Sequence, residues 1–389
     1  MNYDLDQDHA VLQQSVRDFA TRAVAPGAAA RDAEHHLPEA LRKELAAMGL
    51  YGISVPEQYG GSGMGCVAST IVVEEVSKWC AGTGVHLSAH GSLCVDPILL
   101  FGTAEQKAKY LPRLAGGQAI GCLALTEPGS GSDAGAARCM AVEKEDGWHI
   151  DGTKIFVTNG AEAGVIVLIA VADPEDERRR LSAFIVEQPT PGLKIAKLEE
   201  KLGICCTSTA ELLFEDCVLP KANLLGERGK GLRVALTTLD GGRIGIAAQA
   251  LGIAEACLRE SLQYACDRKQ FSRPIGSFQG IQTKIADMAV AIEVARYLTY
   301  RAAWLKDHKK PHEYEGAMAK LFASEAASRS AHACVQIFGG YGYCKDYPAE
   351  RLLRDARITE IYEGTSEIHR LVLARGVMKA FEENWRATI

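Results

Sequence analysis

Residues 125–133 read LTEPGSGSD, and this stretch lies where the sequence pattern changes from helical periodicity to short β-rich runs. Its glycines let the backbone approach a flat or anionic ligand, and its hydroxyls and amides supply hydrogen-bond donors. The same letters also suit a tight loop between a helix and a strand. On composition alone, a ligand-binding loop and a structural loop are equally compatible with this stretch.

Residues 1–120, which precede this loop, have the periodicity of helices. Apolar residues recur at helical spacing in 11–24 and again in 37–50. The pattern resumes in 71–79 and 98–114. We therefore expect an N-terminal helical domain.

Residues 121–230 have the texture of a β domain. Short β-rich runs occupy 165–172, 181–186 and 210–214, and they are punctuated by proline and glycine. Several short strands at this spacing predict a small β-barrel or sandwich. The Asp-Gly pair at 151–152 lies between alternating segments and is typical of a two-residue hairpin turn, because both residues tolerate positive φ.

Residues 231–389 return to helical periodicity. In 281–295 the apolar residues fall at alternating steps of four and three, which places them on one face of a long helix. Similar stripes run through 244–266 and 317–337. Long amphipathic helices suit a four-helix bundle, and apolar side chains on their flanks predict a subunit interface. The predicted fold class is α+β, with an N-terminal helical domain, a middle β-barrel or sandwich domain and a C-terminal helical bundle.

Composition excludes several kinds of partner. The formal net charge is −6 and no long run of lysine and arginine occurs, so no nucleic-acid partner is expected. The acidic N-terminus lacks a signal-peptide pattern, and the apolar runs fall well short of the ~20 residues that span a membrane. None of the twelve cysteines forms a C-x-x-C pair, so we expect reduced thiols, a cytoplasmic location and no metal site.

Three further segments carry residue types that suit a ligand site, although each has an ordinary structural explanation. In KIFVTN at 154–159, Phe156 and Thr158 share one strand face and would place a ring and a hydroxyl beside a cofactor. Such a pair is more often only part of a half-buried strand. Residues 268–288 suit an exposed helix–loop–helix. The glycines of QIFGGYG at 336–342 suit the end of a long helix.

The stretch IYEGTSEI at 361–368 places a carboxylate, Glu363, in a short loop directly before a helix. The first turn of that helix, at 365–367, offers backbone amide donors beside the loop. A lone glutamate is usually a solvated loop acid. This interpretation stays open for Glu363 taken alone.

Taken together, these segments resemble the acyl-CoA dehydrogenase family in order, spacing and intervening texture, over essentially the whole chain. TEPGSGSD and IYEGTSEIHRLVLAR are highly specific. The chain looks closest to the short-chain, butyryl-type branch through LTEPGSGSDAG, TLDGGRIGIAAQALG and ARITEIYEGTSEI. The resemblance implies an FAD-dependent oxidoreductase that removes a proton and a hydride from Cα and Cβ of an acyl-CoA thioester.

The resemblance also implies an FAD site between the β domain and the C-terminal bundle. The flavin would lie along residues 123–132, with Thr126 on its pyrimidine side and Thr158 near N5. The ADP half would be held partly by a neighbouring subunit. The residues implied for the cofactor are, in chain order, Leu123, Leu125, Thr126, Gly131, Ser132, Phe156, Thr158, Arg268, Phe271, Gln279, Gln336, Gly339, Gly340, Thr365 and Glu367.

By the same resemblance, Glu363 is the catalytic base. In part of the family the base lies instead on a helix, at a position that is Gly242 here and has no side chain. The backbone N–H of Glu363 and a ribityl hydroxyl would stabilise the thioester oxygen, each donor contributing ~2.7–4 kcal/mol. Burial should raise the pKa of Glu363 towards neutrality. The residues implied for the substrate are Ser132, Asp240, Arg243 and Gly364.

Two positions depart from the short-chain pattern. Phe156 replaces the tryptophan that commonly lies beside the flavin. Asp96 falls in the segment that lines the acyl pocket in relatives. Asp96 is either the N-cap of a helix beginning at Pro97 or a second acid/base in the pocket. The second interpretation would suit a cyclic acyl-CoA, alicyclic or cyclic enoyl.

The resemblance implies an electron-transfer flavoprotein as the acceptor and a homotetramer built as a dimer of dimers. Two other functions are compatible with the fold: an acyl-CoA oxidase that reduces oxygen, and a CoA-ester binder that has lost catalysis. A short-chain acyl-CoA is the substrate expected.

Overall fold

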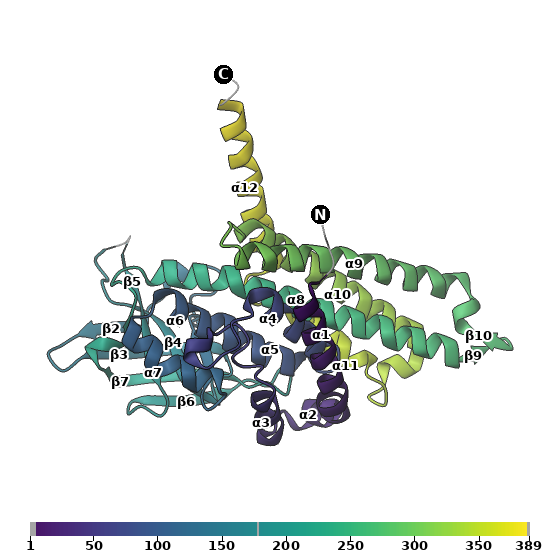
Figure 1. The fold of residues 1–389 in the computed structure, drawn as a ribbon, viewed down its shortest axis with the longest axis horizontal. Coiled ribbons are helices and arrows are strands. Elements are labelled where there is room, and N and C mark those ends of the chain that lie inside the picture. The colour runs from purple at the N-terminus through teal and green to yellow at the C-terminus, as the bar shows by residue number, and fades with distance from the viewer. Residues whose placement is uncertain (1–4, 177–178, 387–389) are drawn as a thin grey trace.

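The chain folds as an N-terminal helical part, a β-sheet and a C-terminal helical part, and the sheet lies at one end of the molecule (Figure 1). This computed structural model describes residues 5–176 and 179–386, so the first four residues of the acidic N-terminus lie outside the described residues. The predicted order of helical, β and helical parts is confirmed. None of the helices in the described ranges is long and apolar enough to cross a membrane.

The N-terminal helices pack around α4, which is buried along most of its length. Its neighbour α1 buries Val16 and Phe19 on one face, and Asp6 caps its start by accepting a hydrogen bond from the His9 N–H. A capping box formed by Thr103 and Gln106 starts α7. The helices are α1 (Gln7–Phe19), α2 (Ala28–Glu34), α3 (Glu39–Ala47), α4 (Gly65–Ser77), α5 (Ala81–His90), α6 (Asp96–Phe101) and α7 (Ala104–Ala115).

The middle part is an eight-stranded sheet with the order β6-β7-β3-β2-β4-β5-β8, and β1 pairs with β4. Its central strands β4 and β5 are almost completely buried and carry the core of this part. The strands are β1 (Ile120–Ala124), β2 (Met140–Glu143), β3 (Trp148–Thr158), β4 (Ala163–Val171), β5 (Leu181–Glu187), β6 (Leu193–Leu198), β7 (Thr209–Leu219) and β8 (Leu224–Leu225).

The hairpin expected at 151–152 is wrong, because β3 runs without a turn from Trp148 to Thr158. The pairing of β3 with β7 shifts register between Ile150 and Gly152. Gly152 has φ +146, and a Cβ there would lie 2.7 Å from the Cα of Cys139. Gly152 therefore permits both the irregularity of β3 and the close approach of the Cys139 backbone.

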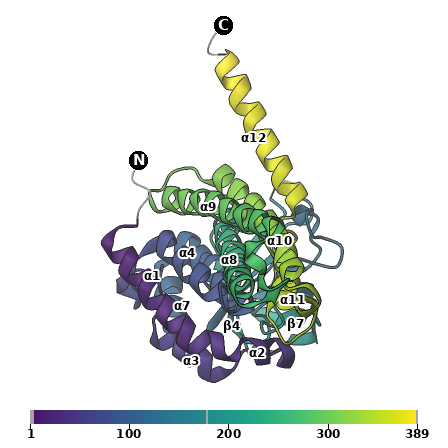
Figure 2. The same cartoon turned by 90° about the vertical axis from the view of Figure 1, so that its right-hand side faces the viewer.

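The C-terminal part consists of long helices with a two-stranded hairpin at the end furthest from the sheet (Figure 1). Alanines dominate the buried faces of α8 and α10, so their backbones can pack closely. The last helix, α12, projects away from the body of the chain (Figure 2). The elements are α8 (Gly231–Asp267), β9 (Lys269–Gln270), β10 (Arg273–Pro274), α9 (Gln279–Asp307), α10 (Glu313–Phe338), α11 (Ala349–Ile358) and α12 (Ser366–Arg386).

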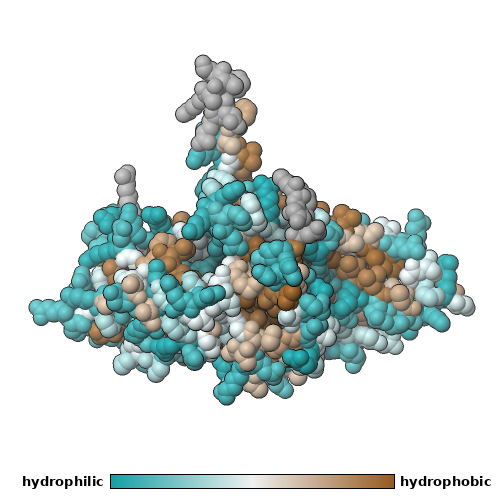
Figure 3. All heavy atoms as spheres, viewed as in Figure 1, coloured by the Kyte–Doolittle hydropathy of each residue, from teal (hydrophilic) through white to brown (hydrophobic). Residues whose placement is uncertain are grey.

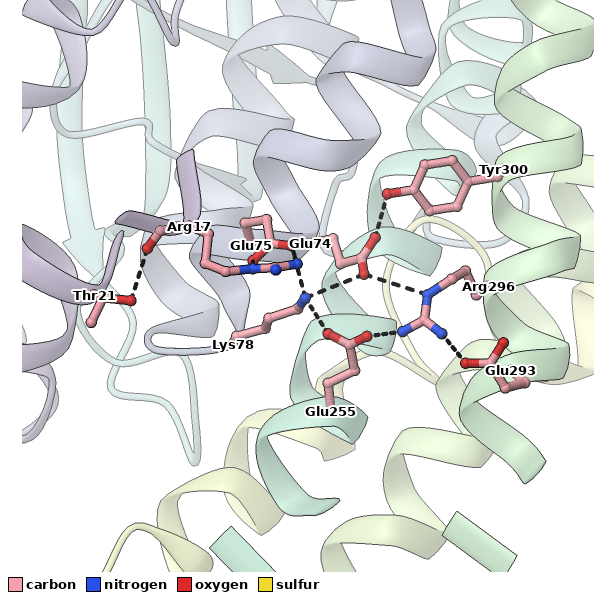
Figure 4. Close-up of polar contacts among 9 residues, drawn as sticks. All are labelled: Arg17, Thr21, Glu74, Glu75, Lys78, Glu255, Glu293, Arg296 and Tyr300. Carbon is pink, nitrogen blue, oxygen red and sulfur yellow. Dashed lines mark hydrogen bonds and ion pairs between the residues drawn. The ribbon is translucent and has the colours of Figure 1, made fainter. Parts of the chain in front are cut away.

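A buried charge network joins the N-terminal helices to the C-terminal ones (Figure 4). Glu74 and Glu75 of α4 are each 1% exposed. Lys78 pairs with Glu75 at 2.9 Å and also with Glu255 of α8, and Tyr300 of α9 donates to Glu74 at 2.5 Å. Breaking a buried pair leaves an uncompensated charge. The network therefore fixes α4 against the helices that carry the candidate site.

Candidate active site

Glu363 lies in a left-handed turn between α11 and α12. Its φ is +55, and the next residue, Gly364, has φ +95. Such a backbone at a residue with a Cβ costs ~1–3 kcal/mol and persists only where the surroundings enforce it. Two contacts fix the ends of the turn: the Tyr362 hydroxyl donates to the Gln249 side chain of α8, and the Thr365 hydroxyl accepts from the Ile368 N–H at 3.3 Å.

The Glu363 carboxyl occupies a space that α8 leaves open at Gly242. A Cβ placed on Gly242 would lie only 2.0 Å from Oε2 of Glu363. This oxygen is buried and has no hydrogen-bond partner within the described part of the chain. Burial raises the pKa of Glu363 to about 7, and the nearby Lys320 and Arg243 oppose this rise. The expected direction of the pKa shift is thus confirmed.

Three of the four implied substrate residues lie near this carboxyl. Arg243 is 6% exposed, and its guanidinium donates to Asp240 at 2.7 Å. Burial raises the pKa of Asp240, whereas Arg243 lowers it. Gly364 directly follows Glu363 in the turn. The structure therefore brings Asp240, Arg243 and Gly364 together with Glu363.

Lys320 and His369 also surround this turn, and sequence reasoning missed both. The fully buried Lys320 of α10 donates to the Gly364 carbonyl at 2.6 Å. The fully buried ring of His369 lies against Gly364, where a Cβ would be 3.0 Å from its Cε1. Burial lowers the pKa of Lys320 to about 8 and that of His369 to about 3. The only sequence signal for Lys320 was a lysine within an alanine-rich stripe.

Asp96 does not cap a helix, so that interpretation is wrong. A π-helical turn, Gly91–Val95, connects α5 directly to α6, and Asp96 itself has helical angles of φ −57 and ψ −50. An N-cap needs an extended backbone at that point. The helical path continues through Pro97 because proline is tolerated in the first turn of α6.

The Asp96 carboxylate instead pairs with Lys306 of α9 at 2.5 Å. A Cβ on Gly241 would lie 2.6 Å from the Lys306 Nζ and 3.5 Å from Asp96 Oδ2. Burial lowers the pKa of Lys306, but Asp96 and other neighbours raise it above the ordinary value. This ion pair and the Glu363 carboxyl therefore border consecutive glycines of α8.

The implied flavin loop is anchored on β3. The Ile155 N–H donates to the Thr126 carbonyl at 2.8 Å, and the fully buried Lys154 ammonium donates to the Leu125 carbonyl at 3.0 Å. The same ammonium pairs with Glu127 at 2.6 Å. Five of the implied cofactor residues lie on or beside β1 and β3, and they are Leu123, Leu125, Thr126, Phe156 and Thr158. Gly131 and Ser132 are exposed at the tip of the loop.

Phe156 presents its ring to the outside of the sheet. It is 60% exposed, has φ +55 and lies where the pairing of β3 with β7 shifts register. The flanking Val157 is buried, and Thr158 is partly exposed. An exposed aromatic ring next to a partly exposed hydroxyl can contact a flat ligand.

The remaining cofactor residues gather at the opposite end of the long helices (Figure 1). Tyr264 stacks on Phe338 with ring centroids 4.1 Å apart, and the Arg268 guanidinium lies 5.7 Å from the Tyr341 ring. Phe271 is 88% exposed in the hairpin. The members of this second group, all exposed, are Arg268, Phe271, Gln279, Gln336, Gly339 and Gly340. Thr365 and Glu367 lie apart from it, at the start of α12.

The residues present fit a flat cofactor with a polar tail. At Gly129 and Gly131 a Cβ would meet nothing within 4 Å, so a ligand can approach the backbone of this loop. The Ser366 hydroxyl at the start of α12 is buried and has no partner among the described residues. Backbone amides at a helix start attract anionic groups. Both features agree with the chemistry of FAD.

Three family models match almost the whole chain: the acyl-CoA dehydrogenase N-terminal domain at residues 6–118, the middle domain at 122–217 and the C-terminal domain at 229–378. The chain belongs to the acyl-CoA dehydrogenase family. It is an FAD-dependent acyl-CoA dehydrogenase, an oxidoreductase that acts on acyl-CoA.

Its similarity to individual members extends over nearly full length. The short-chain specific acyl-CoA dehydrogenase of Mus musculus is 51% identical over 97% of this chain and 92% of that protein. Butyryl-CoA dehydrogenase from Megasphaera elsdenii superposes with a TM-score of 0.95 at 42% identity, covering 97% of this chain and 100% of that chain. A chain from a study of the electron transferring flavoprotein of Acidaminococcus fermentans gives 0.96 at 47% identity, covering 97% and 99%.

Proposed function

We propose that Glu363 is the catalytic base that removes the α-proton of a short-chain acyl-CoA. The observation that carries this proposal is the buried carboxyl oxygen facing Gly242 without a hydrogen-bond partner in the described chain. A carboxylate with a pKa of about 7 is matched to proton transfer near neutral pH. The absence of a side chain at Gly242 keeps this carboxyl free to approach the substrate.

The protein side of the reaction follows from the arrangement around the turn. Arg243, held by Asp240, would contact the thioester and pantetheine arm, and the Glu363 backbone N–H would donate to the thioester oxygen. Such a donor stabilises the developing negative charge by ~2.7–4 kcal/mol. The Glu363 carboxylate then receives the proton from Cα, and the surrounding apolar helices exclude water.

The cofactor would be held by the two groups of residues described above. Thr126, Thr158 and the ring of Phe156 would contact the flavin, and Thr365 with Glu367 would complete the site at α12. FAD, when bound, supplies the acceptor for the β-hydride, which is chemistry that no side chain provides. The protein contributes binding, orientation and the base.

Glu363→Gln tests the assignment of the base, because glutamine keeps the shape and cannot accept the proton. The variant should bind FAD and butyryl-CoA, whereas anaerobic bleaching of the flavin by butyryl-CoA should slow by roughly 10²–10⁴-fold. Binding is followed by the change in the flavin absorption spectrum. Bleaching at the parent rate would refute the role of Glu363.

A short linear acyl group is the substrate we propose, on the strength of the 51% identity to a short-chain specific enzyme. Anaerobic bleaching rates with linear, branched and alicyclic acyl-CoAs would rank the candidates. The rate should peak at the four-carbon ester. A maximum at an alicyclic ester would contradict this assignment.

A second candidate is dehydrogenation of a cyclic acyl-CoA, and one observation favours it. The Asp96–Lys306 pair borders Gly241, next to the glycine that faces Glu363, so a second carboxylate lies near the proposed base. If Asp96 is a second acid/base, Asp96→Asn abolishes turnover of the best alicyclic ester. The double variant Asp96→Asn/Lys306→Met controls for the unpaired lysine. Unchanged turnover on the best substrate would exclude this role.

An electron-transfer flavoprotein is the acceptor we propose, because a chain from a study of such a flavoprotein is 47% identical to this one. The exposed ring of Phe156 would lie where an acceptor approaches the flavin. Turnover should therefore need an added electron-transfer flavoprotein and release little peroxide. Stoichiometric peroxide without it would indicate an oxidase.

The active form we propose is a homotetramer, a dimer of dimers. The first group of cofactor residues lies on or beside β1 and β3, whereas the second lies at the hairpin end of the long helices, so one FAD would draw on two subunits (Figure 1). A groove of about 570 Å³ between α8 and α9, lined in part by Leu258, Leu262, Ala289 and Ile292, offers an apolar contact surface. Apolar atoms also gather on the right-hand part of the face in Figure 3.

The location we propose is the cytoplasm. All twelve cysteines are free, and most are buried in the helical and sheet cores. Unpaired buried thiols are typical of proteins in a reducing compartment. Cell fractionation with an antibody to the chain would test the location.

A further inference from the structure

We propose that Lys320 is a positioning residue for Glu363: its buried ammonium fixes the turn that carries the base and sets the pH range in which the base is ionised. This inference rests on the proposed role of Glu363. Lys320 is fully buried in α10. None of the described carboxylates forms an ion pair with it, and its ammonium donates instead to the Gly364 carbonyl at 2.6 Å. Burying a charge without an ion-pair partner costs free energy of folding. We therefore expect the Lys320 ammonium to have a functional role.

The first part of the argument concerns the shape of the turn. Glu363 and Gly364 both have positive φ, a conformation that a residue with a Cβ adopts only under constraint. The Lys320 hydrogen bond holds the Gly364 carbonyl, and the His369 ring packs where a Cβ of Gly364 would lie. In the turn held this way, the Glu363 carboxyl lies against Gly242 of α8.

The second part concerns charge. Lys320 and Arg243 are the described cations that lower the pKa of Glu363, and Arg243 is already paired with Asp240. Burial lowers the pKa of Lys320 and raises that of Glu363, and each charged group favours the ionised form of the other. The other titratable groups that face this turn or its neighbours are His369, which is neutral near pH 7, and Tyr362, Glu360, Glu367 and the Asp96–Lys306 pair.

The test compares charge-removing and charge-keeping variants of the holoenzyme. Lys320→Met and Lys320→Gln both remove the charge, and the variant that retains its flavin is used for the measurement. Lys320→Arg keeps the charge. Flavin bleaching by butyryl-CoA is measured in single turnovers across pH. Because loss of a nearby cation makes a carboxyl harder to ionise, the acid limb should move up by about one pH unit or more. Lys320→Arg should move it back towards the parent position.

A second readout does not depend on turnover. The carboxyl band of Glu363 in the oxidised holoenzyme is identified by infrared spectroscopy as the band missing from Glu363→Gln. Its titration midpoint should rise in the charge-removing variants by the same amount as the acid limb. Arg329→Gln removes an exposed cation from the same helix, α10, and should leave both midpoints unchanged.

The outcomes separate the two proposals. If Glu363→Gln still bleaches at the parent rate, the role of Glu363 fails. If that variant is inactive while the charge-removing variants keep both the acid limb and the infrared midpoint at the parent value, only the role of Lys320 fails.

Discussion

At the scale of single residues, the sequence identified the groups that belong to motifs but not the charges that tune them. Glu363, Asp240 and Arg243 lie in recognisable stretches, and the structure brings them together. Lys320 and Lys306 had no such signal, because their partners come from elements distant in the chain. The Asp96 cap failed since nothing in the local pattern reveals that one helical path continues through Pro97.

Burial of Glu363 should lower the free energy of unfolding at pH values above the ordinary pKa of its carboxyl. The folded pKa of about 7 exceeds the ordinary value of 4.5, so the folded state keeps a proton that the unfolded state loses. The free energy of unfolding therefore falls as pH rises between these values. In flavin-free protein, Glu363→Gln should be more stable than the parent at pH 8, by up to ~3 kcal/mol. Thermal unfolding measures this.

The matched measurement at pH 4 provides the control for this prediction. There the carboxyl is mostly protonated in both states, so glutamine should give almost none of this gain. An equal gain at both pH values would mean that packing, and not ionisation, causes the difference.

At the scale of elements, periodicity predicted the helices and most strands but not the spaces between them. The stripe in α8 revealed a long helix, yet only the structure shows that Gly241 and Gly242 make room for an ion pair and for the base. The Asp-Gly pair at 151–152 misled because the same letters serve a turn and an irregular strand. Register across β3 and β7 depends on partners that a local pattern does not contain.

Filling the space on α8 should displace the base without unfolding the helix. In Gly242→Ala the new Cβ would lie 2.0 Å from Glu363 Oε2, so the carboxyl must move. A misplacement of about 1 Å can cost on the order of 10²-fold in rate. Single-turnover bleaching by butyryl-CoA measures this loss, while circular dichroism monitors the helices.

Gly280→Ala in α9 is the control for the added methyl group. A Cβ there meets nothing within 4 Å, so bleaching should keep the parent rate. A parent-like rate in Gly242→Ala as well would show that Glu363 does not depend on the space at α8.

At the scale of the whole molecule, the last helix, α12, bears on the proposed homotetramer. The three-part fold was predictable, because helical and β-rich periodicities occupy separate stretches of the sequence. How α12 projects was not predictable, since its apolar positions resemble those of any packed helix. Val377 and Met378 are 70% and 63% exposed on α12, and apolar side chains this exposed mark interaction surfaces when they cluster.

Charged residues on α12 should therefore weaken the assembly. Val377→Asp/Met378→Asp is expected to shift the proposed tetramer towards dimers or monomers, because an aspartate in an apolar interface is costly to desolvate. Light scattering coupled to gel filtration gives the mass. The pair Arg329→Gln/Arg301→Gln, at exposed positions on α10 and α9, serves as the surface control. An unchanged mass would place α12 outside the interface.

The most direct test of the base is a thioester that has α-hydrogens but no β-hydrogens. With acetyl-CoA in D₂O the holoenzyme can exchange the α-protons although no hydride can leave, and nuclear magnetic resonance follows the exchange. The parent should incorporate deuterium at Cα, and Glu363→Gln should do so roughly 10²–10⁴-fold more slowly. Equal exchange by both proteins would contradict the assignment of Glu363 as the group that takes the proton.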